Sequence, residues 1–238
     1  MENKNNDRVV ISGGTTGIGR ALCLALAADG ARVFIFGRHR EALDETIAAA
    51  AGRVSGGLAD VSKPADVERI FREAEKELGG IDSFIASAAL GWQDDIDAET
   101  NWRYVMDVNL TGCIACTQEA AARMKRQGSG RIVLMGSMSA EVMEPRASIY
   151  AATKGAIRSF AGSLRKELNP HGIGVSVVEP GSAASDLHDE SKEKLQSRVD
   201  ALEMLTAEDV ARTIRFILSQ PPRCQIIKVQ IRPLRQLI

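Results

Sequence analysis

Segments typical of strands and helices alternate along almost the whole chain, and this alternation limits the possible folds more than any other feature. Runs rich in β-branched residues predict strands at 9–12, 32–36, 54–58, 81–85, 131–135, 173–178 and 225–231. Segments with helical periodicity predict helices at 17–28, 40–51, 63–78, 98–126, 148–168 and 206–218. Because parallel strands need long, usually helical connections, this order predicts an α/β fold: a doubly wound parallel sheet of seven strands, flanked by helices on both faces.

Composition excludes several classes of protein. The 238 residues include 30 basic and 31 acidic side chains, so neither nucleic acid nor a membrane surface is an expected partner. The polar N-terminus and the lack of a long apolar run argue against a signal peptide or a membrane span. The four cysteines show no disulfide framework, so we expect a soluble, cytoplasmic protein.

Cys113 and Cys116 form a C-x-x-C pair with two alternative interpretations. The pair is compatible with redox chemistry or half of a metal site, but no second pair or nearby histidine completes it. Free cysteines are also commonly packed inside helices. We favour packing and expect no metal site.

A glycine-rich turn links the first predicted strand to the first predicted helix. It reads Ser-Gly-Gly-Thr-Thr-Gly-Ile-Gly-Arg over residues 12–20. Such a turn lets the backbone approach a pyrophosphate closely and directs the amides of the helix N-terminus at its charge. Glycines alone are a weak signal because any tight turn can use them, but their position between strand and helix indicates a dinucleotide site.

The glycine spacing G-x-x-x-G-x-G resembles that of the short-chain dehydrogenase/reductase family, whose Rossmann-type fold binds a nicotinamide dinucleotide. Further motifs follow in the order typical of that family, and the resemblance covers essentially the whole chain: Asp60-Val61, Asn109, Ser137, Tyr150-x-x-x-Lys154 and Pro180-Gly181. The cofactor contacts that this resemblance implies are Gly13, Thr15, Thr16, Gly17, Ile18, Gly19, Arg38, Asp60, Val61, Ala88, Tyr150, Lys154, Pro180, Gly181 and Ser185.

The end of the second predicted strand indicates which dinucleotide is used. No carboxylate lies there to repel a 2′-phosphate, and Arg38 is placed to bind one, so we expect NADP(H). Arg38 can instead be a solvated charge or stack on adenine, and NAD remains an alternative. The resemblance implies that Asp60 binds the adenine amino group; the alternative is that it caps the helix near Lys63.

Tyr150 and Lys154 are the expected centre of the chemistry. Positions i and i+4 share one helix face, so the Lys154 ammonium is expected beside the Tyr150 phenol, where its charge favours the phenolate form. Tyr150 can then exchange a proton with the substrate oxygen. The resemblance implies that Ser137, rather than nearby Ser139, donates a hydrogen bond to that oxygen, and that Asn109 supports a water chain to the lysine.

The sequence departs from the family pattern after the fourth predicted strand. The family commonly shows Asn-Asn-Ala-Gly there, whereas residues 86–89 read Ala-Ser-Ala-Ala. Small residues are kept, so we expect space for the cofactor but altered support around it. Ser185 replaces the usual threonine that binds the carboxamide, and it keeps the hydroxyl.

We expect residues 1–238 to form a single dinucleotide-binding and catalytic domain, with a substrate lid at about 181–205. The substrate region is expected to include Trp92, Met138, Glu141, Val142, Met143 and Arg146. Within it, Arg146 suits a carboxylate, and Glu141 or Glu144 suits a hydroxyl. The ending at 231–236 resembles relatives that act on small polar alcohols. Small residues on the helices at 98–126 and 148–168 suit close packing in a homodimer or homotetramer.

These expectations combine into one predicted function, the transfer of a hydride between NADP(H) and a small polar alcohol or carbonyl. The main alternative is a non-catalytic, dinucleotide-binding regulatory protein, which the altered 86–89 segment permits. The presence of Ser137, Tyr150, Lys154 and Asn109 together argues against it. A dehydratase or epimerase is a second alternative, but little chain remains after the sixth strand to build a large substrate region.

Overall fold

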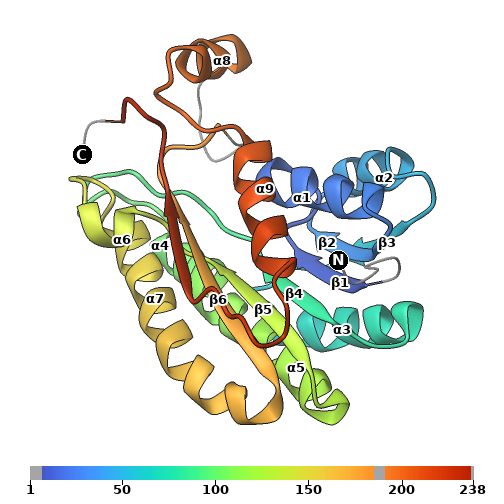
Figure 1. Ribbon diagram of the computed structural model, residues 1–238. Helices are drawn as coiled ribbons and strands as arrows, with labels where there is room; N and C mark the ends of the chain where they lie inside the picture. Colours follow the sequence, from blue (N-terminus) through green and yellow to red (C-terminus); the bar gives the residue numbers. More distant parts are fainter. Residues whose placement is uncertain (1–6, 185–190, 237–238) are drawn as a thin grey trace.

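A computed structural model describes residues 7–184 and 191–236 of the chain. Seven parallel strands form one sheet in the order β3-β2-β1-β4-β5-β6-β7 (Figure 1). The strands are β1 (Arg8–Ser12), β2 (Arg32–Gly37), β3 (Val54–Leu58), β4 (Ser83–Ala86), β5 (Gly130–Met135), β6 (Ile173–Pro180) and β7 (Lys228–Ile231). The predicted doubly wound parallel sheet is therefore confirmed.

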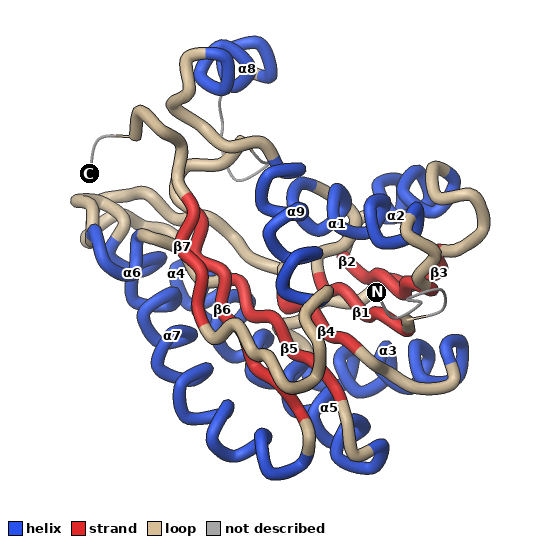
Figure 2. Tube along the Cα trace, in the orientation of Figure 1, coloured by secondary structure: helices blue, strands red, loops and turns tan. Residues whose placement is uncertain are grey.

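Helices cover the sheet on both faces (Figure 2). They are α1 (Gly17–Ala28), α2 (Arg40–Ala48), α3 (Pro64–Leu78), α4 (Trp102–Met106), the π-helix η1 (Asp107–Gly112), α5 (Cys113–Gln127), α6 (Ser139–Val142), α7 (Ser148–Leu168), the 3-10 helix η2 (Asn169–His171), α8 (Lys192–Asp200) and α9 (Ala207–Leu218). α1 and α9 pack together on one face, and α3 and α5 pack together on the other.

Alternation along the strands builds two apolar layers. Val9 and Ile11 of β1 face the layer that contains Leu22 of α1 and Ile214 of α9. Val10 faces the opposite layer, with helix residues of α3, α5 and α7. Successive strand residues point to opposite faces, so a sheet covered on both sides needs apolar residues at every position. This explains the continuous apolar runs in the sequence.

Three predicted elements differ from the structure by more than two residues. The helix expected at 40–51 ends at Ala48, and the strand expected at 225–231 begins at Lys228. The helix expected at 98–126 begins only at Trp102, and its middle is the π-helix η1. In this segment the side chain of Asn101 caps α4 by accepting from the Tyr104 amide at 3.2 Å, which fixes the later start.

The strand order reverses beside β1, which pairs with β2 on one side and β4 on the other. The register aligns Ser12 of β1 with Ala86 of β4, and Ala86 with Leu134 of β5. The segments that follow these strands therefore leave the sheet together, at the carboxyl ends of the strands. In open α/β sheets, ligands bind at these carboxyl ends, beside the point where the strand order reverses.

Across 7–184 and 191–236, none of the helices is both long enough and apolar enough to span a bilayer.

Candidate active site

The turn after β1 packs tightly against the segment after β4. Gly13 has a φ of +66°, and a Cβ added to it would lie 2.7 Å from the backbone of Ala88. The Ala88 amide also donates to the Ser12 hydroxyl at 3.3 Å. A Cβ on Gly19 would lie 2.1 Å from the Gly13 carbonyl oxygen. Glycine is required at both positions because backbone atoms occupy the space of a side chain.

The N-terminus of α1 meets the requirements of an anion site. Thr16 is the N-cap, but its side chain makes no capping hydrogen bond, and the first turn carries no acidic residue. The amides at the start of a 12-residue helix therefore present their partial positive charge without a carboxylate beside them. Together with the glycines, these residues fit the pyrophosphate of a dinucleotide.

Arg38 and Asp60 lie at the ends of β2 and β3, and Tyr104 of α4 joins them. The Arg38 guanidinium donates to the Tyr104 hydroxyl, which donates to Asp60 Oδ2 at 3.0 Å. Asp60 Oδ1 accepts from both the amide and the hydroxyl of Ser62. Burial alone would raise the pKa of Asp60, but the hydrogen bonds from Ser62 and Tyr104 outweigh it and lower that pKa.

The alternative role of Asp60 as a helix cap is wrong, because Lys63 is the N-cap of α3. The neighbouring Val61 is buried in the apolar core. Its packing is close, since a Cβ on Gly112 of η1 would lie 2.7 Å from the Val61 carbonyl oxygen.

Asn109 lies in the π-helix η1 and is almost completely buried. Its amide group bonds the backbone of Leu90 twice: Oδ1 accepts from the Leu90 amide at 2.7 Å, and Nδ2 donates to its carbonyl at 2.8 Å. Nδ2 also lies 3.5 Å from the Thr153 hydroxyl on α7. Leu90 directly follows the altered residues 86–89, so Asn109 fixes the chain at the end of that segment.

The structure brings Tyr150 and Lys154 together on α7. Lys154 is 3% exposed, its Nζ donates to the Met135 carbonyl at 2.9 Å, and it lies 5.4 Å from the centroid of the Tyr150 ring. Lys154 therefore has a fixed position between the end of β5 and the tyrosine. No carboxylate within ion-pair distance neutralises it in the described part of the chain.

Ser137 follows the same strand end. It is buried, and its hydroxyl oxygen accepts from the Ser139 amide at 3.1 Å, which orients it at the start of α6. The Met138 amide donates to the Pro180 carbonyl at 3.0 Å, so the Ser137 segment lies beside Pro180 and Gly181. Ser185 lies outside the described residues.

Among the predicted substrate residues, the charged groups differ in their partners. Arg146 Nε lies 3.3 Å from Asp95 Oδ1, and Glu141 accepts from Gln230 at 2.8 Å and from Arg158 at 3.3 Å. Glu144 differs, because its buried Oε2 has no hydrogen-bond partner among the residues that the structure describes. Two neighbouring residues, Met143 and Arg146, have positive φ angles of 56° and 65°. The unpartnered carboxylate oxygen thus lies in a loop with strained backbone.

Cys113 and Cys116 lie inside α5 and contribute to the apolar core. Burial raises the pKa of Cys113 to about 11 and raises that of Cys116 as well. Their placement agrees with packing rather than redox chemistry, because a reactive cysteine needs an accessible thiolate.

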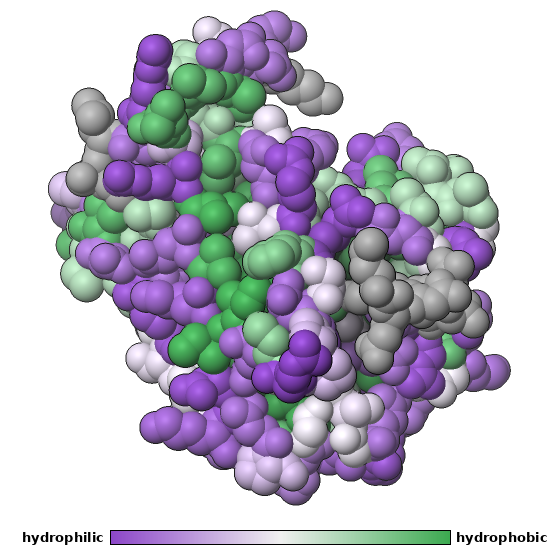
Figure 3. All heavy atoms as spheres, in the orientation of Figure 1, coloured by the Kyte–Doolittle hydropathy of each residue, from purple (hydrophilic) through white to green (hydrophobic). Residues whose placement is uncertain are grey.

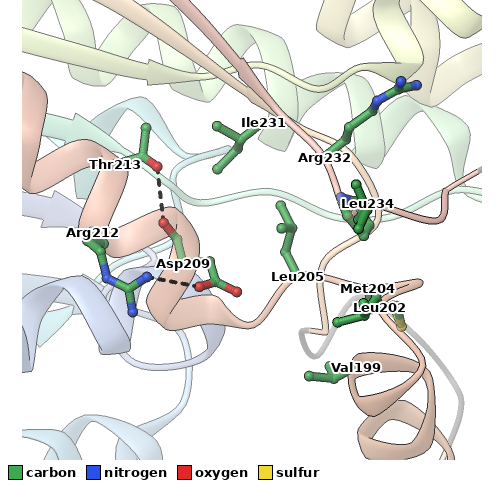
Figure 4. Close-up of a pocket in the computed structure, with 11 residues that line it drawn as sticks. Val199, Leu202, Met204, Leu205, Asp209, Arg212, Thr213, Ile231, Arg232 and Leu234 are labelled. Carbon is green, nitrogen blue, oxygen red and sulfur yellow. Dashed lines mark hydrogen bonds and ion pairs between the residues drawn. The ribbon is translucent and has the colours of Figure 1, made fainter.

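A cavity of about 430 Å³ lies between the 199–205 segment, α9 and the chain after β7 (Figure 4). Leu202, Met204, Leu205 and Leu234 give it an apolar wall. On α9, Asp209 pairs with Arg212 at 3.2 Å at its rim. The proposed chemical residues Ser137, Tyr150 and Lys154 are not among the residues that line this cavity.

Residues 7–196 match the family model described as short chain dehydrogenase. Similar curated proteins include the short-chain reductase protein NovJ of Streptomyces niveus, 32% identical over 87% of this chain and 85% of that protein. Another is farnesol dehydrogenase of Aedes aegypti, 31% identical over 94% of each. Among solved structures, a closed form of serine dehydrogenase complexed with NADP+ has a TM-score of 0.90 at 22% identity, covering 97% of this chain and 96% of that one. A variant of actinorhodin polyketide ketoreductase with NADPH has a TM-score of 0.86 at 23% identity, covering 98% of each.

Proposed function

The chain belongs to the short-chain dehydrogenase family of oxidoreductases, and from this premise we propose that it interconverts a small polar alcohol and its carbonyl with NADP(H) as cofactor. The observation that carries the proposal is the buried Lys154 ammonium beside the Tyr150 phenol, at the carboxyl end of the sheet. Burying a charged side chain is costly, and a protein seldom keeps one without a functional reason. The fixed position of Lys154 next to a proton donor gives such a reason.

The proposed proton transfer takes place at the Tyr150 hydroxyl. In carbonyl reduction Tyr150 gives its proton to the substrate oxygen, and in alcohol oxidation it accepts that proton. Lys154, held by the Met135 carbonyl, stabilises the phenolate that remains. The Ser137 hydroxyl donates to the same substrate oxygen and stabilises the charge that develops there. When bound, the nicotinamide supplies or accepts the hydride.

Proposed cofactor binding uses the edge where the strand order reverses. The glycine-rich turn would surround the pyrophosphate at the start of α1. Its residues are Gly13, Thr15, Thr16, Gly17, Ile18 and Gly19. Arg38 favours NADP(H), because its positive charge can accept a 2′-phosphate. Asp60 and Val61 would lie beside the adenine. Pro180 and Gly181 would lie beside the nicotinamide. Ala88 and Asn109 would support the ribose side.

Glu144 favours a substrate that carries a second hydrogen-bond donor. Its buried Oε2 lacks a partner in the described part of the chain, and a buried acceptor without one is costly. That oxygen is enclosed in this conformation, so the loop that carries Met143 and Arg146 must shift before a substrate hydroxyl or ammonium group can reach it.

We also propose that one domain binds both cofactor and substrate, with the 181–205 region as lid, and that copies of the chain assemble into a dimer or tetramer. Apolar surface follows the edge strand β7 in Figure 3, and Ile227 beside it is 52% exposed, which supports an interface there. Three buried, unpaired thiols support a reducing compartment such as the cytoplasm.

The test is turnover by the purified protein with NADPH or NADH and a panel of hydroxylated and aminated aldehydes and ketones, followed by loss of reduced-cofactor absorbance. We expect substrate-dependent consumption of NADPH that falls at least about 100-fold in Tyr150→Phe. The matched variant Lys154→Met should show a comparable loss, since it removes the charge at similar side-chain size. Tight dinucleotide binding without turnover of any substrate in the panel would favour the non-catalytic alternative.

A further inference from the structure

Tyr104 joins three segments that are far apart in sequence, at the edge of the sheet where the cofactor is proposed to bind. It stands on α4, whereas Arg38 follows β2 and Asp60 follows β3. These residues lie 66 and 44 positions away from Tyr104. The Tyr104 amide donates to Asn101 Oδ1 at the start of α4, and this capping bond fixes the position of the tyrosine.

The hydrogen bonds run in one direction through the Tyr104 hydroxyl. The Arg38 guanidinium donates to Tyr104 Oη, and the Tyr104 hydroxyl donates to Asp60 Oδ2 at 3.0 Å. A phenol has one proton to donate and lone pairs to accept, so both bonds form at once. Burial and the hydrogen bond to Asp60 raise the pKa of Tyr104, and the pKa of Asp60 is lowered. The phenol therefore keeps its proton, and the carboxylate stays ionised, at neutral pH.

The Tyr104 phenol lies between Arg38 and the Asp60 carboxylate, so the charge of Arg38 helps to lower the pKa of Asp60 without a direct ion pair in the described part of the chain. Within the described residues, Arg38 makes no ion pair. Its guanidinium carbon lies 5.5 Å from the centre of the Tyr104 ring. One guanidinium N–H is used by Tyr104, and an arginine has five. The remaining donors and the positive charge stay available at an exposed position beyond β2.

This arrangement matters for one of the two dinucleotides. An arginine that is free to rotate loses side-chain entropy when it binds a phosphate, whereas one already held by a neutral acceptor loses less. A fixed guanidinium suits the paired, charge-assisted hydrogen bonds of a phosphate. NADP(H) carries a 2′-phosphate, and NAD(H) has a hydroxyl there, so holding Arg38 in place favours NADP(H) alone.

We infer that Tyr104 is a specificity-determining residue that selects NADP(H) over NAD(H) by holding the Arg38 guanidinium in position for the 2′-phosphate. The inference rests on the proposed function, because it assumes that the adenosine end of the cofactor lies between β2 and β3. Tyr104 acts through Arg38 and is a positioning residue in this role.

The experiment measures binding, without turnover, by isothermal titration calorimetry. The probes are adenosine 2′,5′-bisphosphate and adenosine 5′-monophosphate, which differ only in the 2′-phosphate. We expect Tyr104→Phe to weaken binding of the bisphosphate by about tenfold, as expected for loss of one hydrogen bond to a charged group. Binding of the monophosphate should change by less than about twofold, because it lacks the 2′-phosphate and Asp60 keeps its two hydrogen bonds from Ser62.

The chain offers a matched control, since its second tyrosine is Tyr150. Tyr150→Phe also removes a phenolic hydroxyl, but at the proposed chemical end, and should leave the ratio of the two dissociation constants unchanged. A double-mutant cycle with Arg38→Ala tests the coupling. In the Arg38→Ala protein, adding Tyr104→Phe should have almost no further effect on the bisphosphate.

Two results would overturn the inference. An unchanged ratio of the two dissociation constants in Tyr104→Phe, or full additivity with Arg38→Ala, would each show that Tyr104 does not act on the 2′-phosphate through Arg38. Failure of the unmutated protein to bind either probe would instead overturn the proposed cofactor site, and the inference with it. Thermal denaturation of each variant checks that the chain remains folded.

Discussion

Replacing Gly19 by alanine tests how closely the glycine-rich turn is packed. The added Cβ would lie 2.1 Å from the Gly13 carbonyl oxygen and 2.8 Å from its carbon. Both are backbone atoms, so no side-chain rotation relieves the contact, and the turn must open. Overpacking of this kind costs about 1–3 kcal/mol. For a chain of this size each kcal/mol lowers the melting temperature by roughly 2–4 °C.

The matched control is Gly162→Ala on α7, where an added Cβ meets no atom within 4 Å. Alanine at this exposed helical position should stabilise the chain by about 0.4–1 kcal/mol. Thermal denaturation compares both variants with the parent, and calorimetry measures their affinity for NADPH. We expect Gly19→Ala to melt earlier and to bind NADPH at least about tenfold more weakly, because the amides of α1 are displaced. A Gly19→Ala protein with the melting temperature and NADPH affinity of the parent would refute the reasoning.

Three further predictions concern other parts of the molecule. Burial would raise the pKa of Asp82, but the hydrogen bonds and charge of Arg8 outweigh it and lower that pKa, so the carboxylate contributes stability above its unfolded-state pKa. That contribution should be lost as the pH falls below about 4, and urea midpoints should decline less steeply with acidification in Asp82→Asn. Burial raises the pKa of Cys23 to about 12 and that of Cys113 to about 11, whereas Cys224 is exposed. Ellman's reagent should therefore titrate one of the four cysteines in the native protein and all four in guanidinium; rapid native titration of more than one would contradict the burial. Glu144→Gln should raise KM about tenfold for substrates with a second hydroxyl or ammonium group and leave KM for analogues without it unchanged, with no loss of thermal stability; equal KM changes for both kinds of substrate would rule out the proposed contact.

Much of the fold follows from local patterns in the sequence. The apolar runs at β1, β2 and β5 are continuous because both faces of the sheet are covered, and the strand and helix order then leaves few arrangements. Gly13 and Gly19 indicate a tight turn from the sequence alone. The structure supplies the backbone atoms that make them necessary.

Features set by irregular backbone were not predicted. The π-helix that carries Asn109 does not change the apolar periodicity, so the segment reads as one long helix. The short helices α6 and α8 are not predicted, because α6 has only four residues and α8 has only two apolar ones, Leu195 and Val199, which are too few to form an apolar stripe. The later start of the 98–126 helix depends on the Asn101 cap, for which the asparagine directly before Trp102 is the sequence signal.

The site shows the same division between local and distant information. Tyr150 and Lys154 share a helix turn, so their spacing was sufficient to place them together. Tyr104 was missed because its partners lie 44 and 66 residues away, and no local motif marks it. Likewise, sequence alone offered Arg146, Glu141 and Glu144 as equal candidates. Only the ion pairs of the folded chain show that Glu144 keeps a free oxygen among the described residues.

The most direct test of the central claim is to follow the transferred hydrogen. NADPH deuterated at C4 on either face is incubated with a carbonyl substrate found by the activity screen, and the alcohol product is examined by mass spectrometry. The proposal predicts one deuterium on the carbinol carbon from one of the two deuterated faces, and no labelled product with Tyr150→Phe. An alcohol product that carries no deuterium from either face would contradict direct transfer between cofactor and substrate.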